Sequence, residues 1–462
     1  MTSLARKLRL ADYFALAFGT MVGVGWLVLM DDWLRRGGPF GAILGFALGG
    51  IILLPVGYVY GQWVQRLPDA AGEAAYTAQV FPPVVSYFTG WMMLLAYFIV
   101  CPWEAVAVGK VAAYIFPSLD SLELYRIAGQ PVFLPRLLLG IALTVFLTTL
   151  NYRGMRLSAN FQNWTTSMVL LLFAIVLGIS LTRGSPANFH PTFRGTPFLS
   201  VLLTLQIVPY FLTGFESVAK CAEEAKPEFQ RRSYLHAIAL ALLVGALFYS
   251  VAIASVAYIA PWQSLLGQRF ATAIAFERAL HAHWPVRLIL VIAFFGLFQC
   301  FNGNFVASSR LLFAFGRNGS VTSRLGRVHE RFQTPSAAVL AICAGTLIAQ
   351  CLGDAILVPV TEVGSVACAL GWLATCLSFF LVVARPPSPS VHGYSLDRSE
   401  KPLISGSSRG TKFLVIATCG ALASFVLVLM KFLPVFPGHF SVAEWIALAV
   451  WVALGVVLRV RS

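Results

Sequence analysis

The sequence predicts an all-α membrane protein with twelve transmembrane helices, ten of them in a core of two inverted five-helix repeats. Three observations carry this prediction: the composition is strongly apolar, apolar segments long enough to cross a bilayer recur, and two of these segments are interrupted near their centres. Of 462 residues, 58% are hydrophobic and 11% are charged, and the mean hydropathy is +0.79. Soluble domains carry roughly 25% charged residues, so a soluble fold is excluded.

A spanning helix needs about 20 mostly apolar residues, and twelve such segments follow one another along the chain. They lie at about 11–34, 40–63, 83–115, 134–151, 158–182, 197–219, 234–260, 286–315, 335–352, 356–384, 411–433 and 440–458. The start, "LARKLRL" (residues 4–10), resembles a signal peptide. No small-residue cleavage site ends the apolar run that follows, so we expect a retained first helix.

The basic residues gather on one side of the expected helices. The net charge is +14, and with the N-terminus inside, about 21 Lys and Arg fall on the cytoplasmic side and about 10 outside. Because cytoplasmic loops carry such an excess, the charge reports orientation and not binding to nucleic acid. We expect a multi-pass protein of the cell membrane (plasma or inner) with both termini in the cytoplasm.

A segment rich in Pro, Ser and Gly, residues 385–410, reads as a cytoplasmic linker. It divides a ten-helix core (1–384) from two peripheral helices (411–462). The core splits into repeats at about 10–182 and 197–384. The first helix of each half is interrupted, by Gly23-Val24-Gly25 in one and by Pro209 and Gly214 in the other. Interrupted segments at corresponding positions indicate an inverted-repeat transporter.

Irregular backbone at membrane depth is tolerated only where protein buries it or where it lines a cavity. A broken helix leaves free N–H groups that attract anions and free carbonyl groups that attract cations. A zwitterion with neighbouring carboxylate and ammonium groups matches both ends. One glycine pair alone is also explained by close helix packing, but the second interruption favours a binding site.

Five stretches resemble motifs of the amino acid–polyamine–organocation transporter superfamily. "GTMVGVGW" (19–26) is similar to its first-helix G-[ST]-M-I-G-S-G-I stretch, and "LPDAAGEAAY" (67–76) to its P-x-A-G-G-x-Y loop before helix three. "GFESVAKCAEEAKPE" (214–228) resembles the sixth-helix pattern, and "NGNFVASSRLLFAFGRNG" (302–319) and "RVHERFQTPSAAVL" (327–340) resemble helix eight and the loop after it. The matches stand in the family's order and cover most of the chain.

The resemblance implies alternating-access transport of an amino acid or related amine, with substrate held by the broken helices. Carried over by position, the backbone of the first helix binds the substrate carboxylate and that of the sixth receives its amino group. These substrate-binding residues are Gly19, Thr20, Gly23, Val24, Gly25, Phe211, Thr213 and Gly214. Tyr210 falls where the family often has an aromatic gate over the bound substrate.

Ionisable residues within spans are expensive and are functional candidates by default. Glu216 either caps the second half of its helix or carries a coupling proton, since burial favours a neutral carboxyl group; the two roles are compatible. Glu104 follows Pro102, which should loosen the backbone. It either faces the cavity and favours a cationic substrate, or pairs with a polar group on a neighbouring helix. Arg310 and Lys110 lie toward span ends and are expected to snorkel.

The coupling ion stays open. Some proton-coupled members of the superfamily carry a lysine in helix five, but residues 158–182 contain no charged residue. Proton coupling through Glu216 or Glu104 is favoured over sodium coupling, for which Thr20, Asn302 and Cys300 are the candidate ligands, and over ion-free exchange. The alternatives are an exchanger or importer of cationic amino acids, polyamines or related amines, and a substrate-binding sensor. No P-loop, G-x-S-x-G, H-E-x-x-H or Rossmann motif occurs, so no enzyme, cofactor or metal is expected.

Overall fold

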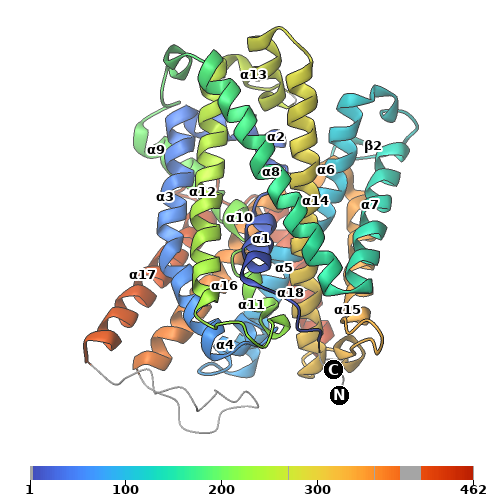
Figure 1. The fold of residues 1–462 in the computed structure, drawn as a ribbon. Helices are drawn as coiled ribbons and strands as arrows, with labels where there is room; N and C mark the ends of the chain where they lie inside the picture. Colours follow the sequence, from blue (N-terminus) through green and yellow to red (C-terminus); the bar gives the residue numbers. More distant parts are fainter. Residues whose placement is uncertain (1–3, 269, 358, 385–406, 461–462) are drawn as a thin grey trace.

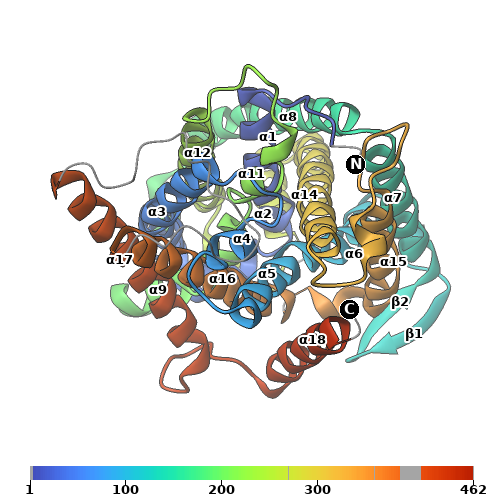
Figure 2. The ribbon, with the colours of Figure 1, turned by 90° about the horizontal axis from the view of Figure 1, so that it is seen from below.

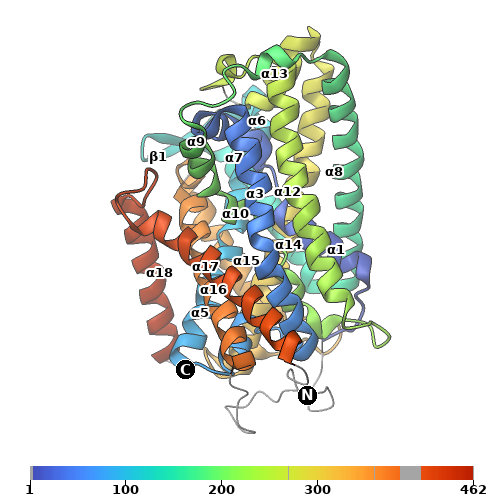
Figure 3. The ribbon, with the colours of Figure 1, turned by 90° about the vertical axis from the view of Figure 1, so that its left-hand side faces the viewer.

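The protein is described by a computed structural model over residues 4–268, 270–357, 359–384 and 407–460. Its long helices run side by side and form a bundle (Figures 1 and 3). Within these ranges, eleven helical segments are long and apolar enough to cross a membrane. Residues 197–220 are divided among three short helices and are not among the eleven. The helical membrane class is confirmed, with a small two-stranded sheet as an addition, and the total of twelve spans stays a prediction.

The helices and strands follow one another in two halves and a final pair of helices. The first half contains α1 (Leu10–Met21), α2 (Gly25–Val28), α3 (Met30–Arg66), α4 (Glu73–Thr77), α5 (Pro83–Phe98), α6 (Val100–Ile115), the antiparallel strands β1 (Glu123–Ile127) and β2 (Gln130–Phe133), α7 (Leu134–Arg153) and α8 (Met155–Arg183). The second half contains α9 (Pro197–Leu205), α10 (Val208–Leu212), α11 (Ser217–Lys220), α12 (Ser233–Ile259), α13 (Ala271–Leu280), α14 (Trp284–Arg317), α15 (Ser336–Ala349), η6 (Gln350–Ile356) and α16 (Pro359–Ala384). The last two helices are α17 (Ser407–Phe432) and α18 (Val442–Val460).

Two expected helix boundaries differ from the observed ones. The gap expected at 35–39 is a kink inside α3, where Gly38 has a φ of 64° and Pro39 follows. Glycine adopts this left-handed conformation without steric cost. The helix expected at 83–115 is divided at Ile99 into α5 and α6. Pro102 lies one turn further on, and its ring clashes with the carbonyl group of the preceding turn, so the local disturbance predicted there is present.

A row of glycines on α3 lets neighbouring helices approach closely. Gly41, Gly45 and Gly49 recur every four residues and therefore share one helix face. A Cβ atom added to Gly41 or Gly45 would lie 2.6 Å or 2.7 Å from the nearest side-chain atom, Cβ of Ser200 or of Thr204 on α9. Such small-residue faces drive helix packing in membranes because lipid supplies no hydrophobic force between helices. They hold the broken segment 197–220 against α3.

The final two helices lie at the rim of the bundle, whereas α2 and α11 lie near its centre (Figure 2). Of the residues in the apolar stretch of the first span, 78% are buried, against 11% in α18. α17 begins at Ser407, inside the linker expected at 385–410, and residues 385–406 of that linker lie outside the described residues. The division of the core into two inverted repeats stays a prediction.

The expectation that Arg310 snorkels is wrong. Its side chain is fully buried on α14 and pairs with Glu224 at 3.3 Å. Glu224 ends the short 3₁₀ helix Ala222–Glu224 that follows α11, and its carboxylate contacts α14 there. A buried cation needs such a partner, because an uncompensated charge in this setting costs several kcal/mol. The partner lies 86 residues away in the sequence, beyond the reach of any local pattern.

Candidate functional site

The first transmembrane segment is broken where its glycines predict. α1 ends at Met21 and α2 begins at Gly25, so residues 22–24 are not helical. A Cβ atom on Gly23 would lie 2.1 Å from Oε1 of Glu104, and one on Gly25 would lie 2.6 Å from the ring of Phe211. Side chains from α6 and α10 thus touch the backbone of the break, and only glycine leaves room for them.

The sixth segment is broken at residues 213–216, between α10 and α11. Gly214 has a φ of 130°, a conformation that other residues rarely adopt. The segment is also interrupted at residues 206–207, between α9 and α10, and Pro209 follows in the first turn of α10, where its missing N–H is harmless. A Cβ atom on Gly214 would lie 2.8 Å from the backbone nitrogen of Met21, so the second break lies against the end of α1, directly before the first break.

Side chains of α12 and α14 hold the carbonyl groups released at the first break. The hydrogen bonds run from Tyr249 to the carbonyl oxygen of Met21 (2.7 Å), from Gln299 to that of Val22 (2.7 Å) and from Asn304 to that of Thr20 (3.0 Å). These donors satisfy groups that would be costly to bury alone. The end of α1 is therefore held in place by the protein itself and is less available to a cation than the sequence suggests.

A small pocket with free space of about 20 Å³, room for about one water molecule, lies between the two breaks and α6. Its lining residues, all buried, are Thr20, Met21, Gly23, Gly25, Val100, Trp103, Glu104, Tyr210, Phe211, Thr213, Tyr249 and Cys300. Ligand pockets span roughly 300–1,000 Å³, so a substrate enters this one only when the segments around it move apart. It is enclosed by protein and combines an aromatic wall with a few polar groups.

The pocket brings together most of the predicted site residues. Those that line it are Thr20, Gly23, Gly25, Tyr210, Phe211, Thr213, Glu104 and Cys300. Val24 and Gly214 lie in the breaks themselves. Gly19 lies away from the pocket, since a Cβ atom there would meet the side chains of Gln162 and Gln299.

Glu216 closes the second break. Its carboxylate accepts a hydrogen bond from the backbone N–H of Gly214 at 3.0 Å and another from the hydroxyl group of Thr213. The side chain is fully buried. Glu216 is the N-cap residue of α11, but its side chain accepts no hydrogen bond from the backbone of α11, so the side-chain cap expected of it is absent. Because Thr213 also lines the pocket, Glu216 is connected to the pocket through one hydroxyl group.

The structure places Asn302 away from the pocket, contrary to its expected place beside Thr20. Its side-chain oxygen accepts hydrogen bonds from Asn151 (2.9 Å) and Ser158 (3.1 Å), and its nitrogen donates to Gln162 (2.8 Å). Residues four apart share a helix face and residues two apart do not. Cys300 therefore faces the break together with Asn304, while Asn302 faces α7 and α8.

Sequence reasoning missed a buried ion pair next to the second break. Lys220 on α11 pairs with Glu73 on α4, and neither side chain is exposed. Tyr60 on α3 donates a hydrogen bond to the same carboxylate at 2.8 Å. The Lys220 ammonium also lies 5.6 Å from the centre of the Tyr97 ring. The available signal was a lysine four residues after Glu216, inside a largely apolar segment.

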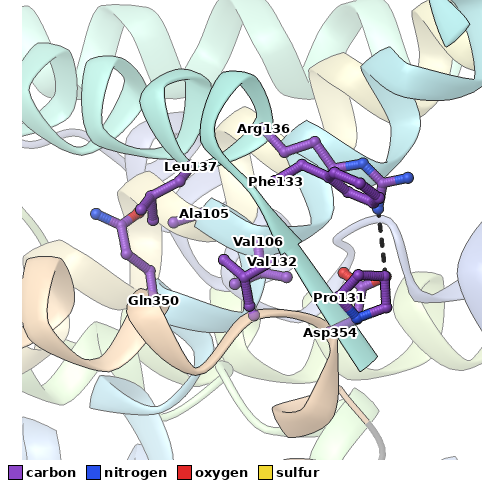
Figure 4. A pocket seen from close by; sticks show the side chains of 10 residues that line it. Ala105, Val106, Pro131, Val132, Phe133, Arg136, Leu137, Gln350 and Asp354 are labelled. Carbon is purple, nitrogen blue, oxygen red and sulfur yellow. Dashed lines mark ion pairs between the residues drawn. The ribbon is translucent and has the colours of Figure 1, made fainter. Parts of the chain in front are cut away.

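A second pocket borders the opposite face of α6, toward β2, α7 and η6 (Figure 4). Figure 4 shows Ala105 and Val106 on one side and Arg136 on the other, where Arg136 pairs with Asp354 at 3.5 Å. None of the predicted site residues lines this pocket. The pocket between the breaks is therefore the candidate substrate site.

Comparison with known proteins agrees with this geometry. A family model described as amino acid permease matches residues 8–458. The chain belongs to the amino acid permease family. This permease is 24% identical to a branched-chain amino acid permease of Bacillus subtilis (strain 168), over 84% of this chain and 83% of that protein. It is 25% identical to a methylthioribose transporter of Bacillus subtilis (strain 168), over 72% of each chain. It is also 23% identical to the aspartate–proton symporter of that organism, over 72% of this chain and 65% of that protein.

The match confirms the resemblance found in the sequence. This permease is a multi-pass integral membrane protein and a transporter, not an enzyme. The names of its relatives include an amino acid class, a single acidic amino acid and a thio-sugar. Family membership therefore does not identify the substrate. Its identity depends on the side chains around the pocket.

Proposed function

We propose that this permease is a secondary active transporter that moves amino acids or closely related amines across the cell membrane by alternating access, coupled to protons. The observation that carries the proposal is the enclosed pocket between two broken segments in contact with each other. Discontinuous helices at the bilayer midplane are the usual binding element of inverted-repeat transporters. The excess of Lys and Arg on one side of the expected helices supports the proposal that both termini lie in the cytoplasm.

Reconstitution into liposomes tests the proposal directly. Purified permease should accumulate labelled amino acids or amines from a panel when an inward proton gradient is imposed, and an imposed sodium gradient alone should not drive uptake. Tight binding without any flux would contradict transport and indicate a sensor. Uptake driven by sodium alone would contradict proton coupling while leaving transport intact.

Glu216 is the proposed proton carrier. Its carboxylate is buried, it bonds to the pocket residue Thr213, and it belongs to a break that touches the first segment. Protonation would remove the charge that the Gly214 N–H and the Thr213 hydroxyl group hold in place. The protonation state of Glu216 would thereby alter the conformation of the break between α10 and α11. The aspartate–proton symporter among the relatives supports the choice of ion.

The variant Glu216→Gln should lose the dependence of uptake on external pH, because an amide cannot bind and release a proton in this range. Uptake should be measured in liposomes from pH 5 to 8 with a constant membrane potential. The matched control is Glu277→Gln on α13, whose carboxylate faces His283 outside the pocket. A pH profile shared by wild type and Glu216→Gln would exclude Glu216 as the carrier.

A further inference from the structure

The carboxyl group of Glu104 lies where the first break would receive an anion. Its Oε1 atom is so close to Gly23 that a Cβ atom there would lie 2.1 Å away. The carboxyl group also interacts with the backbone N–H of Val24 and the thiol of Cys300. Glu104 comes from α6, and its side chain is 2% exposed. The chain's own carboxylate thus occupies the position that we expected the substrate carboxylate to take.

The second oxygen of this carboxyl group is left without a partner. Oε2 is buried and accepts no hydrogen bond, and the hydroxyl group of Tyr210, which also lines the pocket, has no partner either. In the described ranges no lysine, arginine or histidine pairs with Glu104. A buried carboxylate is costly unless a cation or several donors compensate it. The pocket therefore lacks a positively charged donor beside Glu104.

The rest of the lining suits the body of an organic cation. Trp103, Phe211 and Tyr249 contribute aromatic rings to the pocket. Aromatic faces attract ammonium groups and pack well against apolar carbon. A protonated amine on a small apolar or aromatic frame would meet the charge of Glu104 and pack against these rings.

We infer that the substrate is a small organic amine that carries no carboxylate group, because Glu104 supplies the carboxylate to the first break. This inference rests on the proposed function, since it names the substrate class of the same pocket. An amino acid would bring a second carboxylate to the amides that Glu104 already contacts. Two like charges at such short range repel strongly in a buried site, so an amino acid would bind only after Glu104 is neutralised or displaced.

Matched pairs of ligands test the inference on the full-length permease in detergent. Leucine and 3-methylbutylamine share one side chain, as do phenylalanine and 2-phenylethylamine, and the members of each pair differ by the carboxylate. Binding measured by calorimetry should favour the amine of each pair by about tenfold or more, because only the amino acid brings a second carboxylate beside Glu104. Tighter binding of the amino acids would overturn the inference and leave the proposed function intact. Saturable uptake of a compound that is neither amine nor amino acid, with no binding of either pair, would overturn both.

Two substitutions link the preference to Glu104. Glu104→Gln removes the charge but keeps the shape, and should weaken amine binding about tenfold or more while leaving amino acid binding unchanged or improved. Glu104→Gly vacates the space beside Gly23 and should shift the preference toward the amino acid of each pair. Glu123→Gln, on the exposed strand β1, is the matched control and should bind as wild type does. Equal loss of both ligand classes in folded Glu104→Gln would overturn the inference.

Discussion

Replacement of Gly25 by leucine abolishes substrate binding and uptake, while the protein still inserts into the membrane. A Cβ atom at this position would lie 2.6 Å from the ring of Phe211. That ring cannot withdraw, because it packs against Trp33 with 4.8 Å between ring centroids and against Tyr249 at 5.7 Å. Overpacking of this kind costs about 1–3 kcal/mol, and the remaining leucine atoms would enter the pocket itself.

The measurement is ligand binding and liposome uptake by Gly25→Leu, with expression and gel-filtration profile recorded alongside. The matched control is Gly178→Leu on α8, where an added Cβ atom meets nothing within 4 Å. Both variants add the same apolar side chain within a membrane span, and only one adds it to the pocket. Wild-type uptake by folded Gly25→Leu would show that substrate does not bind between the two breaks.

The variant Lys220→Met is expected to destabilise the permease strongly. It leaves the Glu73 carboxylate buried without its cation, although Tyr60 still donates to it. Breaking a buried ion pair in this way costs about 3–5 kcal/mol. The thermal unfolding temperature in detergent should fall well below that of the wild type, or the folded yield should collapse.

The double variant Lys220→Met, Glu73→Gln removes both charges and should recover most of the lost stability, because neither partner is then left uncompensated. Arg126→Met, which breaks an exposed pair with Glu123, serves as the control and should behave as wild type since exposed pairs contribute little. If Lys220→Met alone unfolds at the wild-type temperature, the pair does not stabilise the junction of α4 and α11.

The breaks in the two transmembrane segments were predictable because they depend on local chemistry. Glycine within an apolar run disfavours helix whatever surrounds it, and the structure breaks at residues 22–24 and 213–216 accordingly. Pro209 follows a further discontinuity of the sixth segment, at residues 206–207 between α9 and α10. Proline cannot continue a helix through its own N–H but is accommodated in a first turn, so α10 begins just before it.

The polar residues of α14 show why the sequence did not reveal which side chains of this helix face the first break. Cys300, Asn302 and Asn304 lie within five residues of one another, and each is a plausible ligand for the first break. The rotation of α14 about its axis decides which of them faces α1, and that rotation follows from packing against α6 and α8. Asn304 therefore bonds to the carbonyl group of Thr20, while Asn302 bonds to Gln162.

The sequence by itself determined the membrane class, the family and the positions of the two interruptions, since apolar composition, motif order and helix-breaking residues are all properties of short segments. Only the tertiary structure decided the partners. Glu224 meets Arg310, Glu73 meets Lys220, and the carboxyl group of Glu104 fills the space beside Gly23. Each contact joins segments far apart in the chain. Which charges meet there depends on how whole helices pack in the bilayer, and no local pattern contains that information.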